Sequence, residues 1–279
     1  MAVQTFVTPA SAEDAVRLMA EHPAKARYVA GGTDLMCQTD RPDFLINIEN
    51  LLRYRKREKG EFVIGASTTV AEIGADEKLA ELDAGLFREC AQAFATLQIR
   101  NMATVGGNLA SSVPSADLAP PLLVLDAQAV ILNSKGRRTV PLTQFFSGAH
   151  ENVLGKGLLL EVRFPVPESG VKTTFLKVGR NPGDIAQISV AALAHLEQNV
   201  FQKVRIALGA VYPTPLRAFE AEAFLQGKPA HAKNIQRAAE LAQAAVRTIS
   251  DQRASAEYRR YLSLILTRRA LQHLVRGQA

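Results

Sequence analysis

The sequence predicts an α+β fold in two domains, and three observations support this. Strand-like and helix-like segments alternate near the beginning of the chain. Three consecutive strand-like runs and then three helical patterns follow residue 170. Between these regions, residues 164–170 contain two prolines and a glycine, which interrupt both periodicities. A length of 279 residues fits two domains of roughly 100–200 residues each. We therefore expect one domain over residues 1–168 and a smaller one over 172–279.

The first part of the chain has β-α-β character. Thr5-Phe6-Val7 predicts a short strand. Ser11-Ala12-Glu13-Asp14 resembles a capping box, which predicts a helix over residues 15–20. Further strands are predicted at residues 28–30, at 44–48 and from residue 62.

The middle of the chain continues with mixed elements. Apolar residues at helical spacing predict a helix over 86–97, and an apolar run predicts another over 118–125. Strands are expected at 129–132 and 158–164. Beyond the Pro-rich linker, residues 173–178, 188–196 and 201–211 predict an antiparallel meander. The last helices are expected at 216–225, 232–249 and 256–275.

Composition excludes several classes of protein. The chain is 47% hydrophobic and 22% charged, which is typical of a globular protein. Its only cysteines, Cys37 and Cys90, cannot form a disulfide framework, a four-thiolate zinc site or a four-thiolate iron–sulfur cluster. The beginning of the chain has no signal-peptide pattern, and no apolar run reaches transmembrane length. We therefore expect a soluble, cytoplasmic protein.

The charge of the chain permits an anionic ligand. The formal net charge is +6, and the sharpest basic cluster covers residues 53–59. This cluster is either a phosphate-binding patch or a solvated hairpin, because Lys59-Gly60 precedes an apolar run. The chain has no tryptophan, and no aromatic residues alternate with a long basic stretch, so stacking on nucleic-acid bases has little support.

Several familiar catalytic and nucleotide-binding motifs are absent from the sequence. It has no G-x-G-x-x-G, no H-E-x-x-H and no G-x-S-x-G. Residues 148–157 only loosely imitate a P-loop, because Gly157 stands where serine or threonine is needed. Since the five histidines are scattered, we expect no metal site built by this chain.

Two Gly-Gly pairs remain as the candidate site. Gly31-Gly32 follows a short predicted strand, and Gly106-Gly107 lies in a second polar segment. Glycine permits positive φ and close approach of a ligand, and successive amides in such turns bind anions. The two loops together would hold the two phosphates of a dinucleotide. The alternative is that both pairs only form tight turns.

The glycine pairs belong to an ordered set of motifs. Residues 30–35 read A-G-G-T-D-L, residues 100–108 read R-N-M-A-T-V-G-G-N, and residues 114–120 read P-S-A-D-L-A-P. Later segments at 175–184, 208–218 and 268–270 continue the set. In this order and over nearly the whole chain, they resemble the FAD-binding subunit of the molybdenum hydroxylases, a family that includes xanthine dehydrogenase and aerobic carbon monoxide dehydrogenase.

The resemblance implies a fold and a cofactor site. The expected fold is a two-lobed FAD-binding domain of the PCMH/vanillyl-alcohol-oxidase type, with lobes of about 1–55 and 56–168, followed by the smaller α+β domain. FAD would bind noncovalently. The residues expected around its pyrophosphate and adjoining ribityl chain are Ala30, Gly31, Gly32, Thr33, Asp34, Thr104, Val105, Gly106, Gly107 and Asn108.

Four further residues match cofactor positions of the family. Asp117 would accept a hydrogen bond from a ribose hydroxyl; alternatively, it caps the helix over 118–125. Leu159 would lie near the adenine, or is simply a buried strand residue. Lys177 would lie at the isoalloxazine edge, where a cation stabilises the reduced anionic flavin. Ile185 would approach the flavin ring.

The resemblance also implies a function and partners. No catalytic acid–base pair is expected on this chain, because the flavin performs the chemistry. The chain would take electrons from [2Fe–2S] clusters of a small partner subunit and pass them to NAD⁺, dioxygen or another acceptor. A large partner subunit would hold the molybdopterin cofactor, giving a dimer of heterotrimers. The alternatives are a stand-alone flavin oxidase and a nucleic-acid-binding protein.

Overall fold

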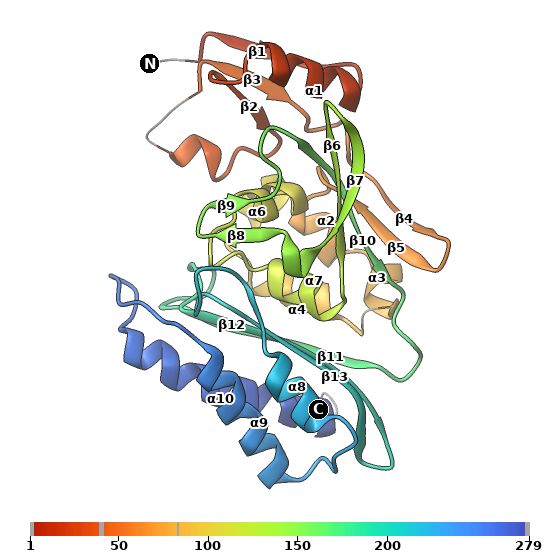
Figure 1. The fold of residues 1–279 in the computed structure, drawn as a ribbon, viewed down its shortest axis with the longest axis vertical. Helices are drawn as coiled ribbons and strands as arrows, with labels where there is room; N and C mark the ends of the chain where they lie inside the picture. The colour runs from red at the N-terminus through yellow and green to blue at the C-terminus, as the bar shows by residue number, and fades with distance from the viewer. Residues whose placement is uncertain (1–2, 39–41, 83, 277–279) are drawn as a thin grey trace. The chain divides into compact units, whose positions relative to one another are not determined.

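The computed structural model describes residues 3–38, 42–82 and 84–276, which divide into two compact units. Unit 1 comprises residues 1–72, 96–112 and 126–165, and unit 2 comprises residues 73–95, 113–125 and 166–279. Figure 1 labels most of the elements of both units. The division into 1–168 and 172–279 stays a prediction, and residues 73–95 and 113–125 of the first half belong to unit 2.

The first part of unit 1 is a parallel β-α-β layer, as expected. Its sheet has the strand order β1-β3-β2, and α1 precedes β2 (Figure 1). Ser11 is the N-cap of α1, and its Oγ accepts a hydrogen bond from the Asp14 amide at 3.0 Å. The capping prediction is therefore confirmed. The elements are β1 (Thr5–Val7), α1 (Ala12–Glu21), β2 (Ala26–Val29), η1 (Leu35–Cys37) and β3 (Phe44–Asn47).

The second part of unit 1 is an antiparallel sheet with the order β4-β5-β10-β6-β7. Its strands are β4 (Arg55–Glu58), β5 (Glu61–Gly65), β6 (Gln128–Asn133), β7 (Gly136–Pro141) and β10 (Leu158–Pro165). Short elements connect or cover them: α5 (Leu97–Met102), α6 (Val105–Ala110), η2 (Leu142–Gln144), β8 (Phe146–Gly148) and β9 (Glu151–Asn152). The helix α2 (Val70–Gly74) lies where the chain passes into unit 2.

The basic cluster at residues 53–59 forms a hairpin, which favours the solvated-hairpin interpretation. The turn between β4 and β5 has positive φ at Lys59 (50°) and Gly60 (83°). Arg53 and Arg55 both pair with Glu72, at 3.0 and 3.3 Å. These charges are therefore already partly neutralised by the protein.

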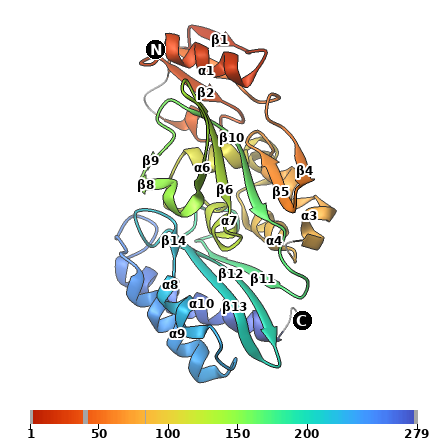
Figure 2. The same ribbon diagram turned by 45° about the vertical axis from the view of Figure 1, so that its right-hand side comes forward.

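Unit 2 is a sheet of order β11-β12-β13-β14 with helices on both faces. The helices α8, α9 and α10 lie on one side of it, and α4 and α7 lie on the other (Figure 2). All residues from 188 to 194 of β12 are buried, so both faces of this strand are covered. The elements are α3 (Glu77–Leu82), α4 (Leu86–Ala93), α7 (Ala119–Val124), β11 (Lys172–Val178), β12 (Ile188–Glu197), β13 (Val200–Gly209), β14 (Leu216–Arg217), α8 (Phe219–Leu225), α9 (Ala232–Ala245) and α10 (Ala256–Arg276).

The predicted meander and the three final helices are present, with shifted ends. The helix expected over 86–97 is divided, because α4 ends at Ala93 and α5 begins at Leu97. Ala95 between them has a φ of 33°, which a continuous helix does not permit. Among the described residues, none of the helices combines the length and apolarity needed to cross a membrane.

Candidate functional site

The first glycine pair forms a tight loop directly after β2. Gly32 has a φ of +66°, a left-handed conformation that favours glycine. Its carbonyl accepts a hydrogen bond from the Met36 amide at 2.9 Å, which leads the chain into η1. At Gly31, an added Cβ would lie 1.7 Å from the Met102 carbonyl oxygen. Both glycines are therefore required, one for its backbone conformation and one for close contact with the end of α5.

The backbone amides of this loop are available for a ligand. Within the described part of the chain, the N–H groups of Gly31, Gly32, Thr33 and Asp34 donate to no protein acceptor. Successive amides around a residue with positive φ form a concave anion-binding arrangement. The Asp34 carboxylate is engaged with Gln38, whose Nε2 donates to Oδ2 at 3.0 Å. Ala30, Gly31, Gly32 and Thr33 are partly exposed and Asp34 is exposed, so a ligand can reach the loop.

The second glycine pair lies in a helix and not in a turn, and its expected contact with the cofactor stays a prediction. Gly106 and Gly107 belong to α6, and Thr104 is the N-cap of that helix. The first four amides of α6 all donate hydrogen bonds to acceptors within the protein. The pairs are Val105 N–Thr68 O (2.9 Å), Gly106 N–Ala66 O (2.7 Å), Gly107 N–Thr104 Oγ1 (3.0 Å) and Asn108 N–Thr104 O (2.9 Å).

The two glycines of α6 have different surroundings. An added Cβ on Gly106 would lie 2.6 Å from the Ala66 Cβ and 2.8 Å from the Ala66 carbonyl oxygen. An added Cβ on Gly107 would meet only the Thr104 Oγ1, at 3.0 Å. Gly107 is exposed, whereas Thr104, Val105 and Gly106 are buried and Asn108 is partly exposed. Gly106 therefore permits close packing of α6 against Ala66, while at Gly107 no side chain covers the surface of α6.

Asp117 and Lys177 form a buried ion pair in unit 2. The Lys177 Nζ lies 2.6 Å from the Asp117 Oδ2, and their side chains are only 6% and 8% exposed. The same ammonium donates to the Ala93 carbonyl at 3.0 Å. Burial raises the pKa of the Asp117 carboxyl to about 6, while the charge of Lys177 and its hydrogen bond oppose that rise. The Asp117 Oδ1 is buried and has no hydrogen-bond partner among the described residues.

The ion pair helps to decide whether Asp117 caps a helix or accepts a hydrogen bond from a ribose hydroxyl. The N-cap of α7 is Leu118, and no side-chain hydrogen bond caps this helix. The helix-capping alternative is therefore wrong. The carboxylate binds Lys177 through one oxygen, and the other oxygen keeps its capacity to accept a hydrogen bond.

The remaining two candidates differ in exposure. Leu159 is buried (4% exposed) in β10, where it pairs with Ile131 beside an irregularity in the strand register. Ile185 is 55% exposed and follows Gly183, whose φ is +84°. An added Cβ on Gly183 would lie 2.9 Å from the Ala95 carbonyl oxygen. That loop of unit 2 therefore requires glycine, and it presents Ile185 to solvent.

The structure also contains a feature that the motif analysis missed. Four cationic side chains, Lys135, Arg137, Arg138 and Lys156, line one cavity in unit 1. The sequence signal was the basic hairpin Lys135-Gly136-Arg137-Arg138, but the contribution of Lys156 appears only in the fold. No group of three or more potential metal ligands occurs among the residues described here.

Comparison with known proteins places these features in a family. Residues 2–167 match the model of the FAD-binding domain in molybdopterin dehydrogenase. Residues 173–274 match the CO dehydrogenase flavoprotein C-terminal domain.

Individual relatives match over almost their full length. The xanthine dehydrogenase FAD-binding subunit of Escherichia coli O157:H7 is 32% identical, over 95% of this chain and 94% of that protein. The carbon monoxide dehydrogenase medium chain of Hydrogenophaga pseudoflava is 30% identical, over 95% of each chain. The solved structure of reconstituted CO dehydrogenase from Oligotropha carboxidovorans contains a chain with a TM-score of 0.95 and 29% identity, matched over 100% of this chain and 99% of that one.

Proposed function

Because the chain belongs to the family of FAD-binding subunits of xanthine and carbon monoxide dehydrogenases, the molybdenum hydroxylases, we propose that it transfers electrons within a multi-subunit enzyme of that type. It is an oxidoreductase subunit with an FAD-binding domain. Electrons would arrive from [2Fe–2S] clusters on a small partner subunit and leave to an acceptor such as NAD⁺ or dioxygen. When bound, FAD supplies the ability to accept electrons one at a time and to donate them as a pair.

The observation that carries this proposal is the set of unpaired amides at residues 31–34. Four consecutive N–H groups that donate to no acceptor among the described residues suit a diphosphate, which offers several anionic oxygens at close spacing. Gly31 and Gly32 remove the side chains that would block such an approach. Thr33 and Asp34 complete the same turn. This part of the chain therefore fits the pyrophosphate of FAD.

The second motif supports the first loop instead of forming an equivalent one. The Met102 carbonyl, at the end of α5, is the atom against which Gly31 lies. The chain then continues through Ala103, whose carbonyl accepts the Val70 amide at 2.9 Å, into the capped helix α6. We assign Thr104, Val105 and Gly106 to holding this segment in place, and Gly107 and Asn108 to the surface beside it.

The expected contacts in unit 2 stay predictions. The Asp117 Oδ1 has no hydrogen-bond partner in the described part of the chain, which supports a role in accepting a hydrogen bond from a hydroxyl of the cofactor. Lys177 already neutralises the other oxygen, so any charge effect on a flavin would come from the pair and not from a lone cation. Leu159 near the adenine and Ile185 near the flavin ring rest on the resemblance alone.

The need for partner chains follows from the cysteines. Each [2Fe–2S] cluster takes four protein ligands, mostly thiolates, and this sequence has two cysteines. Cys90 is buried and its Sγ donates to the Asp117 carbonyl, whereas Cys37 is exposed in η1. The iron–sulfur clusters and the molybdopterin cofactor would therefore belong to other subunits, in an assembly of two heterotrimers.

The first experiment is an absorption spectrum of the chain expressed alone, followed by heat release and chromatography of the coloured compound. We expect one FAD per chain, released without covalent attachment. The reduced flavoprotein is then mixed with NAD⁺ or dioxygen, and the faster reoxidation identifies the acceptor. A chain that is colourless and takes up no added FAD would refute the proposal. Turnover of an organic substrate without partner subunits would instead favour a stand-alone oxidase.

A further inference from the structure

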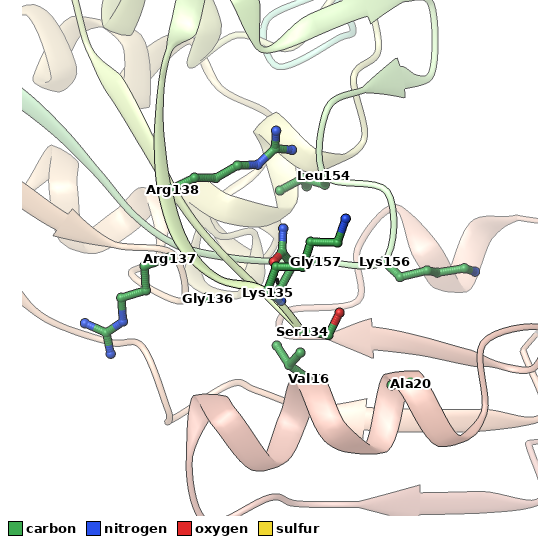
Figure 3. Close-up of a pocket in the computed structure, with 11 residues that line it drawn as sticks. Val16, Ala20, Ser134, Lys135, Gly136, Arg137, Arg138, Leu154, Lys156 and Gly157 are labelled. Atoms are coloured by element: carbon green, nitrogen blue, oxygen red, sulfur yellow. Dashed lines mark hydrogen bonds between the residues drawn. The ribbon is translucent and has the colours of Figure 1, made fainter.

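A cavity of about 540 Å³ lies in unit 1 at a distance along the chain from both glycine pairs. Its walls come from three segments: α1, the β6–β7 hairpin and the loop over residues 154–157 (Figure 3). None of residues 30–34 or 104–108 lines it. Its volume falls within the range of roughly 300–1,000 Å³ that is usual for small-molecule sites.

The charged side chains that line this cavity are all positive. Lys135, Arg137 and Arg138 extend from the hairpin, and Lys156 extends from the facing loop (Figure 3). Among the residues that the structure describes, no aspartate or glutamate belongs to the lining. Such a concave cluster of one sign concentrates anions, since each cation adds to the same potential.

Two of these four cations are not neutralised by the protein. Within the described residues, neither Lys135 nor Lys156 has a carboxylate or any other side-chain partner for its ammonium group. Arg137 pairs with Glu13 at 3.3 Å, but both side chains are more than 60% exposed, so this pair is weak. Arg138 donates to the Val153 carbonyl, which ties the hairpin to the loop that carries Lys156.

The opposite wall is apolar. Val16 and Ala20 face the cavity from α1, and Leu154 adds a third apolar side chain (Figure 3). The Ser134 hydroxyl supplies a neutral donor at the tip of the hairpin. A ligand that fits both walls has anionic oxygens at one end and a compact organic group at the other.

We propose that this cavity is a second anion site, which binds a small phosphate-bearing organic molecule of the nucleotide class. Lys135 and Lys156 bind its phosphates, and the α1 wall contacts its organic part. Because none of residues 30–34 or 104–108 lines the cavity, we expect its ligand and FAD to be bound at the same time.

The test measures binding of ADP, in the presence of EDTA, to the chain as purified, by calorimetry. FAD content is determined first, so a failure of the FAD assignment is recognised separately. We expect ADP to bind to FAD-loaded protein without displacing FAD. Binding becomes at least tenfold weaker in K135A/K156A, and it weakens steeply as salt increases.

A matched control separates the cavity from general charge. Lys78 and Lys233 are exposed lysines on helices of unit 2, so K78A/K233A removes the same charge elsewhere. ADP binding is expected to stay within twofold of the parent value in this variant. Equal weakening in both double variants would overturn the proposal, because the effect would then come from net charge.

Two further results address the ligand class and the separateness of the site. Ala20 is exposed on α1, so A20E places a carboxylate at the cavity with little risk to folding, and it should weaken ADP binding. Inorganic pyrophosphate, which lacks the organic part, should bind at least fivefold more weakly than ADP. The proposal fails if ADP binds only after FAD is removed, or if FAD-loaded protein binds neither probe.

Discussion

Replacing Gly31 by alanine tests the assignment of the anion-binding loop most directly. An ideal Cβ at this position lies 1.7 Å from the Met102 carbonyl oxygen, whereas ordinary contacts begin at 3.4 Å. The loop and the end of α5 must therefore separate by about 1.7 Å, the difference between the two distances. That displacement exceeds the spread of hydrogen-bond lengths, which is roughly 0.5 Å.

The expected loss of FAD affinity follows from the bonds that this displacement breaks. A hydrogen bond to a charged acceptor is worth about 1.5–3 kcal/mol, so losing two of the four amide contacts costs about 3–6 kcal/mol. This corresponds to roughly a 10²- to 10⁴-fold increase in Kd, since each 1.4 kcal/mol is tenfold. The assay is titration of FAD-free chain with FAD, followed by flavin fluorescence. A G31A chain whose Kd for FAD stays within threefold of the parent value would refute the reasoning.

Control variants distinguish loss of the ligand site from loss of the fold. Gly60 has a φ of +83° with no described atom within 4 Å of an added Cβ, so G60A introduces backbone strain in the β4–β5 turn, outside the FAD loop. We expect G60A to lose about 1–2 kcal/mol of stability and to keep its FAD affinity. G32A strains the FAD loop without the severe contact, and should weaken FAD binding less than G31A. Circular dichroism and thermal melting of the FAD-free proteins establish that each variant is folded.

Four further predictions concern stability, each measured by urea unfolding at matched FAD content. K177M leaves the Asp117 carboxyl buried without its cation, which should lower the free energy of unfolding by about 3–5 kcal/mol at pH 8. The loss should be clearly smaller at pH 5, because a carboxyl with a raised pKa is protonated there. Equal losses at both pH values would contradict this expectation. In the parent protein the raised pKa means that stability from Asp117 is present at low pH and decreases as the pH rises through about 6. G106A places a Cβ 2.6 Å from the Ala66 Cβ, so it should cost about 1–3 kcal/mol, and an unchanged unfolding midpoint would disprove the packing role. S11A removes the cap of α1 and should cost about 1 kcal/mol, whereas S11T should lose much less.

Local signals in the sequence predicted the elements that depend on neighbouring residues. The Ser11 cap and the turn at Lys59-Gly60 involve only nearby residues, and both are found in the structure. The antiparallel meander β11–β12–β13 likewise follows from three apolar runs with short connections. In each case the deciding contacts lie within a few residues, or between consecutive strands.

The second glycine pair shows where local reasoning fails. Glycine has a low helix propensity, so Gly106-Gly107 favoured a turn. The helix α6 forms because Thr104 caps it and because the carbonyls of Ala66 and Thr68 accept its first two amides. Those acceptors are nearly 40 residues earlier in the sequence, so only the fold brings them to α6.

The sequence could not predict which helices belong to unit 2, for a similar reason. The run Ile-Ser-Val-Ala-Ala-Leu-Ala at residues 188–194 has no apolar–polar alternation, which indicates a strand buried on both faces. The final helices cover one face of it. Nothing in the pattern says that α4 and α7, from the first half of the chain, cover the other. The Asp117–Lys177 pair joins residues 60 positions apart in the same way.

The two glycine pairs look alike in sequence, but their amides differ in whether the protein supplies a hydrogen-bond acceptor. Their roles therefore differ. The amides of Gly31 and Gly32 have no acceptor in the described part of the protein, so their hydrogen bonds are left for a ligand. The amides of Gly106 and Gly107 are satisfied internally, so they stabilise the fold whether or not a ligand is bound. Substitutions in the first pair should therefore reduce FAD affinity more than stability, and substitutions at Gly106 should do the reverse. A glycine motif identifies a place where side chains are excluded, and the hydrogen-bond partners decide whether a ligand or another part of the protein occupies that space.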